Sequence, residues 1–121
     1  VINQFELDRW IMQAKAANNA GSLGEAYALL SRCLSKKPNH AEAHFLMGLW
    51  KQDDIEKMDD VLTHFETALK NQYDEFEVRY RRGVYLHKVG DRKKALVDLQ
   101  KAAELKPEHE GVQKALAALT S

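Results

Sequence analysis

The 121-residue sequence has little of what secreted, membrane-spanning or disulfide-stabilised proteins require. It contains one cysteine, Cys33, which excludes an internal disulfide and favours a reducing, cytoplasmic compartment. No apolar run approaches about 18 residues, so we expect no transmembrane helix. The N-terminus lacks a basic segment followed by an apolar one, so we see no signal peptide. It also lacks an initiator methionine, so we expect a fragment or a processed product from which a targeting segment can be missing.

Motifs for catalysis and for nucleotide or metal binding are also missing. The sequence has no Gly-rich phosphate loop, no HExxH and no CxxC. His40 and His44 are four residues apart, which is the spacing that places two metal ligands on one helical face. No third ligand lies near them in the sequence, and His44 is better explained as a packing residue. We therefore expect no enzyme activity, no metal and no cofactor.

The chain as a whole has no excess of charge of either sign. Its 18 basic and 18 acidic residues give no global field that would attract nucleic acid or an anionic membrane. The parts differ, because residues 40–75 hold nine acidic and three basic residues, whereas residues 76–106 hold nine basic and four acidic ones. Two alternatives stay open: neighbouring segments screen each other, or a bipolar surface orients a charged partner.

The only basic cluster surrounds Arg79, Arg81 and Arg82. On a helix Arg79 and Arg82 share a face, and Arg81 points elsewhere. Few aromatic residues interleave with this cluster, and the domain lacks an overall basic footprint. We therefore expect no nucleic-acid binding.

What the sequence does contain is a repeated pattern of small and apolar residues on a helix-forming background. Only two prolines and six glycines interrupt the chain, which favours helices. The clearest copy of the pattern runs from Gly83 to Pro107. Equivalent residues recur at intervals of 34 or 35 positions, in the series Ala14, Gly48, Gly83; Ala26, Val61, Ala95; Leu30, Phe65, Leu99; and Cys33, Ala68, Ala102.

This period and these offsets resemble the tetratricopeptide repeat (TPR), a pair of antiparallel helices with small residues where the helices touch. The resemblance covers about 100 residues and implies an all-α right-handed solenoid of seven helices in a single domain, 1–121. Repeat one is expected at about 7–40, repeat two at about 41–75, repeat three at about 76–109, and a capping helix at about 110–121. Repeat two carries one extra residue between Gly48 and Val61.

Local sequence features mark the starts of three helices. Ser22 with Glu25, and Asn39 with Glu42, predict two capping boxes. Asp91 follows a glycine and predicts an N-cap. These positions agree with the boundaries that the repeat pattern implies.

The resemblance also implies a function, because TPR domains bind other proteins in a concave groove lined by the first helix of each repeat. The groove positions of this chain combine an apolar centre with polar neighbours. We predict a non-enzymatic adaptor that binds an extended peptide or an amphipathic helix. The alternative is a structural or self-association module within a larger protein. The predicted peptide-binding residues are Ile11, Lys15, Asn18, Phe45, Leu49, Gln52, Tyr80, Arg81, Val84 and His87.

One specific function of the family is disfavoured. Co-chaperone TPR domains bind the C-terminal carboxylate of heat-shock proteins with Lys, Asn and Arg at five groove positions. Here those positions hold Ile11, Lys15, Leu46, Glu77 and Arg81. Only Arg81 agrees, and Glu77 would repel a carboxylate, so we do not expect a chaperone C-terminus as the ligand.

Overall fold

Within residues 3–120, which the computed structural model describes, every regular element is a helix. The elements are α1 (Gln4–Asn19), α2 (Leu23–Lys36), α3 (Ala41–Lys51), a short 3-10 helix η1 (Ile55–Lys57), α4 (Met58–Lys70), α5 (Glu75–Lys88), α6 (Arg92–Leu105) and α7 (Glu110–Thr120).

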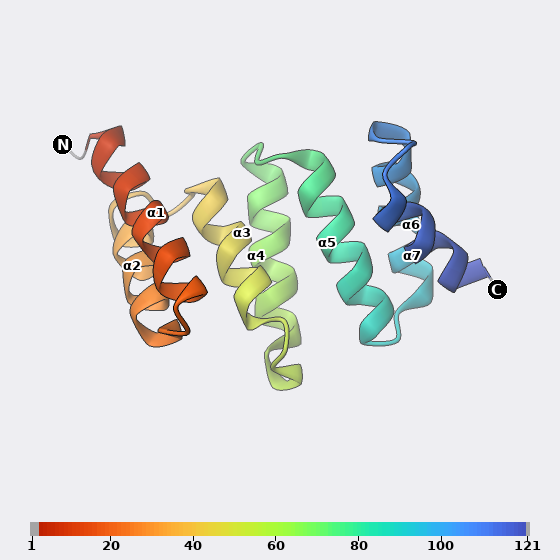
Figure 1. Ribbon diagram of the computed structural model, residues 1–121, viewed down its shortest axis with the longest axis horizontal. Coiled ribbons are helices and arrows are strands. Elements are labelled where there is room, and N and C mark those ends of the chain that lie inside the picture. The colour runs from red at the N-terminus through yellow and green to blue at the C-terminus, as the bar shows by residue number, and fades with distance from the viewer. Residues whose placement is uncertain (1–2, 121) are drawn as a thin grey trace.

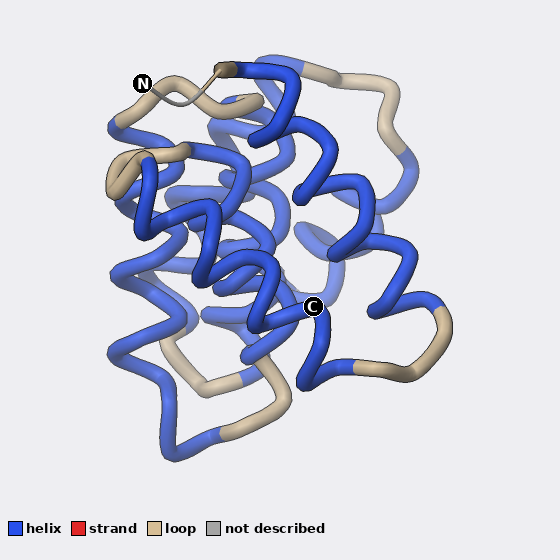
Figure 2. Tube along the Cα trace, turned by 90° about the vertical axis from the view of Figure 1, so that its left-hand side faces the viewer, coloured by secondary structure: helices blue, strands red, loops and turns tan. Residues whose placement is uncertain are grey.

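Consecutive helices form pairs that stack into a solenoid. The closest pairs are α1 with α2, α3 with α4, and α5 with α6, while α2 meets α3 and α4 meets α5. The pairs stand side by side in chain order, and the two termini lie at opposite ends (Figure 1). Viewed from the α1 end, the helices lie one behind another and are joined by short loops (Figure 2). The prediction of an all-α right-handed solenoid is confirmed.

Small residues explain why the helices of a pair approach so closely. A Cβ atom placed on Gly48 would lie 3.0 Å from the ring of Phe65, and one on Gly83 would lie 2.7 Å from Leu99 Cγ. In each case the glycine is on the first helix of the pair and the large apolar residue is on the second. The small residues of the repeat pattern are therefore contact points between helices, as the sequence predicted.

An apolar core runs through the solenoid and is closed by α7. The largest cluster joins buried residues from α1 to α5, among them Leu30, Phe65 and Tyr85. At the other end, Leu119 of α7 packs with Leu86 and Leu99, and Val112 of α7 packs with Phe76 and Ala102. The last helix thus covers the apolar face of α5 and α6. No helix within residues 3–120 is long and apolar enough to cross a membrane.

The helix starts agree with the prediction at Ser22 and Asp91 and differ from it by one residue at Asn39. The Asp91 side chain caps α6. Ser22 occupies the N-cap position of α2, but its side chain makes no capping hydrogen bond. α3 begins at Ala41, so its N-cap is His40 and not the predicted Asn39. The buried His40 ring accepts a backbone N–H at Nδ1, which requires this nitrogen to be unprotonated.

Candidate functional site: the open face of α1, α3 and α5

The first helix of each pair turns one face toward its partner and leaves another face open. On α5, the residues that contact α6 include Gly83 and Arg82. Residues one position further along fall about 100° around the helix, so Val84 does not point at α6. Val84 is 40% exposed on this open face. The other predicted groove residues are Tyr80, Arg81 and His87, also on α5; Ile11, Lys15 and Asn18 on α1; Phe45 and Leu49 on α3; and Gln52 directly after α3.

Two predicted groove residues lie in the core instead of on the surface. Ile11 and Phe45 are only 3% and 4% exposed. The Phe45 ring stacks on Tyr73, with ring centroids 4.9 Å apart, and tilts against Phe65 at 5.9 Å. Neighbouring repeats therefore pack closely enough to enclose both side chains. We correct the prediction here, because Ile11 and Phe45 offer no surface to a partner.

Three other apolar residues remain accessible and define what we call the groove strip: Leu49, Tyr80 and Val84. Leu49 and Tyr80 are half-buried, so each is held by the core and still presents part of its side chain. The predicted polar residues differ in exposure. Asn18 and Gln52 are half-buried, whereas Lys15, Arg81 and His87 are exposed.

The charged residues of this face are already engaged with one another. Lys15 Nζ lies 2.7 Å from a carboxylate oxygen of Glu42, which links α1 to α3. Arg81 Nε lies 3.4 Å from Glu77, and its guanidinium carbon lies 5.2 Å from the centroid of the Tyr80 ring. The single arginine that matches the chaperone clamp thus has a carboxylate beside it.

Tyr73 is a residue of this region that the groove prediction missed. Burial, together with the nearby carboxylates of Glu42, Glu77 and Asp74, raises the pKa of Tyr73 to about 12. The carboxylates of three acidic side chains therefore lie near Tyr73. The sequence held a sign of this, because Tyr73 stands where the other two repeats have proline.

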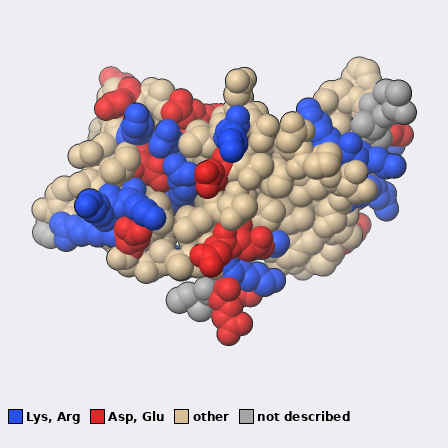
Figure 3. Space-filling model, turned by 180° about the vertical axis from the view of Figure 1, so that it is seen from behind, with Lys and Arg blue, Asp and Glu red and all other residues tan. Residues whose placement is uncertain are grey.

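The charge difference between the second and third repeats is visible on the surface. On the side opposite to the view of Figure 1, acidic side chains project at the connection between α3 and α4, and basic ones gather toward the C-terminal end and also at the N-terminal end (Figure 3). Lys88 of α5 reaches Asp53 of that connection, with 3.0 Å between Nζ and a carboxylate oxygen. This contact is an instance of screening between neighbouring repeats.

Neither a metal-ligand cluster nor a reactive thiol is found among the described residues. Among residues 3–120, no cluster of three or more His, Cys, Asp or Glu side chains could hold a metal ion. Cys33 is completely buried, and this burial raises the pKa of its thiol to about 11. The thiol therefore stays neutral and behaves as a small apolar group.

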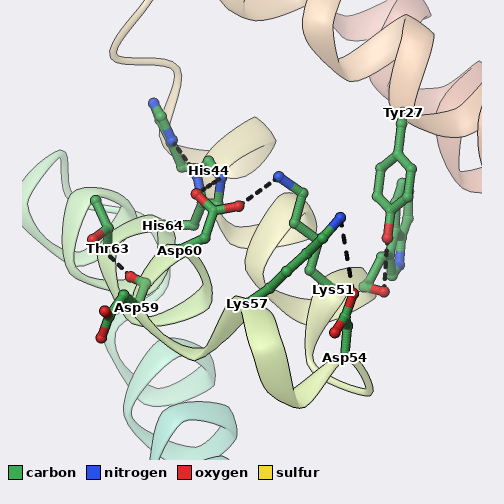
Figure 4. A network of polar contacts seen from close by, with 10 residues as sticks. Tyr27, His44, Lys51, Asp54, Lys57, Asp59, Asp60, Thr63 and His64 are labelled. Carbon is green, nitrogen blue, oxygen red and sulfur yellow. Dashed lines mark hydrogen bonds and ion pairs between the residues drawn. The ribbon is translucent and has the colours of Figure 1, made fainter.

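His44 belongs to a network of polar contacts between α3 and α4 (Figure 4). Its Nε2 lies 2.7 Å from the Pro38 carbonyl oxygen and donates to it, because a carbonyl oxygen only accepts. Its Nδ1 lies 2.9 Å from Nδ1 of His64, and one of these two nitrogens carries the proton of the hydrogen bond. On its other side His64 Nε2 lies 3.5 Å from Asp60, and Lys51 Nζ lies 2.8 Å from the same carboxylate.

Acid is expected to destabilise the fold through His40 and His64. Burial is the main cause that lowers the pKa of each of these side chains below the ordinary value of 6.5. The unfolded chain therefore binds protons more readily than the folded chain, so the stabilising contribution is complete above pH 6.5 and decreases as the pH falls below it. Urea unfolding at a series of pH values from 7.5 to 5.0 measures this slope.

A double variant separates this effect from other titrations. His40→Asn keeps a side chain that can cap α3, and His64→Gln keeps a donor toward His44. We expect the double variant to be less stable at pH 7.5 but to show a flatter pH dependence. An unchanged slope would assign the acid sensitivity to other groups.

Comparisons with known proteins agree with the architecture. No protein-family profile matches the chain. A segment of DnaJ homolog subfamily C member 3 from chicken (Gallus gallus) is 33% identical over 98 residues; the match covers 75% of this chain and 20% of that protein, so the chain spans about a fifth of the relative's length.

Three solved structures illustrate the shared fold. The first TPR of Spaghetti (RPAP3), bound to the HSP90 peptide SRMEEVD, superposes with a TM-score of 0.85 at 13% identity, covering 98% of this chain and 94% of that one. A mutant O-GlcNAc transferase of Thermobaculum terrenum gives 0.86 at 20% identity, covering 98% and 23%. MamA (AMB-1) gives 0.77 at 24% identity, covering 93% and 61%.

Proposed function

Because the chain has the fold of a tetratricopeptide-repeat domain, we propose that it is a non-enzymatic module that binds a peptide or an amphipathic helix of a partner protein. The observation that supports this most directly is the groove strip of Leu49, Tyr80 and Val84. Leu49 and Val84 remain accessible on α3 and α5 above a well-packed core. Tyr80 keeps part of its side chain accessible although His109 packs against its ring, with 5.1 Å between the ring centroids. The cytoplasmic location expected from the single cysteine stays a prediction.

The chemistry of the strip favours a ligand with an apolar side. Apolar groups that are held partly open and flanked by polar ones are typical of protein-binding surfaces. The strip has Gln52 and His87 toward one end of its helices, and Glu42 and Glu77 toward the other. A ligand that places two or three apolar side chains on the strip would keep its polar side in contact with these residues or with water.

A chaperone C-terminus does not fit this surface. The RPAP3 domain binds the HSP90 peptide SRMEEVD, but it shares only 13% of its residues with this chain. Here Arg81 is already beside Glu77, and Lys15 is already beside Glu42. A carboxylate ligand would have to break these pairs and approach Glu77. We therefore expect no measurable binding of SRMEEVD.

A matched pair of substitutions tests the proposed site. Val84→Glu and Val97→Glu make the same change at positions that are 40% and 52% exposed, but Val97 lies on α6 beside a different hollow of about 380 Å³. Peptides are first selected from a displayed random library with the unchanged chain. Their affinity for each variant is then measured by fluorescence anisotropy, with circular dichroism as the control for folding.

We expect Val84→Glu to weaken binding at least tenfold, because a buried carboxylate in an apolar contact costs more than about 1.4 kcal/mol. Val97→Glu should leave binding unchanged. If Val97→Glu weakens binding and Val84→Glu does not, the peptide binds at the hollow on α6 and not at the groove strip. Failure to select any peptide with the folded chain would contradict the proposed function itself.

A further inference from the structure

The outward face of α1 carries an apolar stripe that no other element within residues 3–120 covers. Phe5 and Met12 are 84% and 70% exposed, which is unusual for large apolar side chains. Met12 follows Phe5 by seven positions, and the small residue Ala16 follows Met12 by four. The three residues therefore fall along one side of the helix. They line a shallow hollow of about 440 Å³ together with Asp8, Arg9 and Gln13.

The repeat pattern shows that this face is built for contact. In α3 the positions equivalent to Arg9 and Met12 are Ala43 and Leu46, and both are buried in the core that α3 shares with the preceding helices. In α5 the position equivalent to Ala16 is Tyr85, which is buried where α5 meets α4. In α5 the position equivalent to Met12 is the exposed Arg81, so this face is only partly covered there, whereas in α1 it is open and keeps large apolar side chains.

We propose that this face of α1 binds a second copy of the chain and forms a two-fold symmetric dimer. The charges beside the stripe favour this occupant. Successive residues on a helix are about 100° apart, so Asp8 and Arg9 flank the stripe on opposite sides at nearly the same height. A two-fold axis parallel to α1 therefore places Asp8 of one copy beside Arg9 of the other, and symmetry makes this contact twice.

The same arrangement brings the apolar side chains together. Phe5 meets Phe5 of the second copy, Met12 meets Met12, and Ala16 allows the helices to approach closely. The face has no net charge, because Asp8 and Arg9 cancel, so repulsion does not oppose the pairing. An unrelated basic or acidic partner would gain nothing from this neutral surface.

This dimer should be weak. One pair of helices buries less area than the standard interfaces of about 1,200–2,000 Å², so we expect a dissociation constant on the order of 10–500 µM. Sedimentation equilibrium of the 121-residue chain between 5 and 500 µM measures it. We expect a reversible monomer–dimer equilibrium, and a chain that stays monomeric at 500 µM would overturn the proposal.

Charge exchange tests the geometry of the contact. Asp8→Arg and Arg9→Asp each place like charges together across the axis, so each variant alone should be at least tenfold weaker in self-association. Mixing the two single variants should give a heterodimer, because every contact across the axis then joins opposite charges. The double variant Asp8→Arg with Arg9→Asp should regain the original affinity.

Two further variants separate this surface from the groove strip. Phe5→Glu should abolish dimerisation without unfolding the chain, because Phe5 is almost fully exposed. Val84→Glu should leave dimerisation unchanged. If the single charge variants dimerise as well as the unchanged chain, or if Val84→Glu prevents dimerisation, α1 is not the interface and the proposal is wrong.

Discussion

Replacing Asp98 with alanine is expected to lower the free energy of unfolding by about 3–5 kcal/mol. Asp98 is a buried residue of α6. Its carboxylate accepts hydrogen bonds from Arg82 at 2.7 Å and 2.8 Å and from Arg79 at 3.1 Å. Alanine would leave the largely buried Arg82 guanidinium without a counter-charge, and it would leave Arg79 with only Glu75, 3.5 Å from its Nε. Urea unfolding followed by circular dichroism measures the loss.

The large expected loss in the free energy of unfolding comes from leaving buried arginine charges uncompensated. It does not mean that the ion pairs themselves make a large net contribution to stability. Repeat one makes this point, because its residues equivalent to Arg79 and Asp98 are Trp10 and Leu29, which pack on the apolar core. A triple variant that replaces Arg79 by Trp, Arg82 by Met and Asp98 by Leu removes all three charges together. We expect it to be at least as stable as the unchanged chain.

The two variants form a controlled comparison. A loss below about 1 kcal/mol for Asp98→Ala would mean that water reaches the arginines and replaces the carboxylate. A triple variant as unstable as Asp98→Ala would mean that the α5–α6 pair depends on the ion pairs for its geometry. Either result would contradict the explanation given above.

The architecture could be predicted from the sequence because its determinants are local and repeated. A small residue such as Gly83 marks a helix contact, and it recurs opposite a large apolar residue such as Leu99 in each pair. Turn residues such as Gly21 and Gly90, with φ of 82° and 93°, mark where the helices end. These features depend on short stretches of chain, so their spacing indicated the helices, and the resemblance to the tetratricopeptide repeat indicated how they pair.

The residues of the candidate site were harder to predict from the sequence, because the exposure of a side chain depends on how neighbouring repeats pack. Ile11 and Phe45 occupy groove positions of the family, yet the adjacent helices enclose them. Arg79 and Arg82 were correctly placed on one helical face, but they looked like part of a basic surface. The sequence could not reveal that Asp98, 16 and 19 residues away, lies buried between them.

Gly83→Ala is expected to lower the free energy of unfolding by about 1–3 kcal/mol, although alanine favours helices over glycine by about 1 kcal/mol. The added Cβ would lie 2.7 Å from Leu99 Cγ and 2.9 Å from Leu99 Cδ2. Leu99 is fully buried, so it has no free space into which to move. Urea unfolding measures the change. The free energy of unfolding decreases only if the steric cost of the added Cβ exceeds the gain in helix propensity.

Gly24→Ala is the matched control, because Gly24 lies in α2 and a Cβ there would meet nothing within 4 Å. It should stabilise the chain by up to about 1 kcal/mol. Repeat one sharpens the comparison, since Ala14 occupies the position of Gly83 opposite Leu30 and both are fully buried. A helix pair can therefore accommodate alanine at this contact when its helices are spaced for it. If Gly83→Ala stabilises the chain as Gly24→Ala does, α5 and α6 can separate to that spacing at no cost, and glycine is not required for their packing.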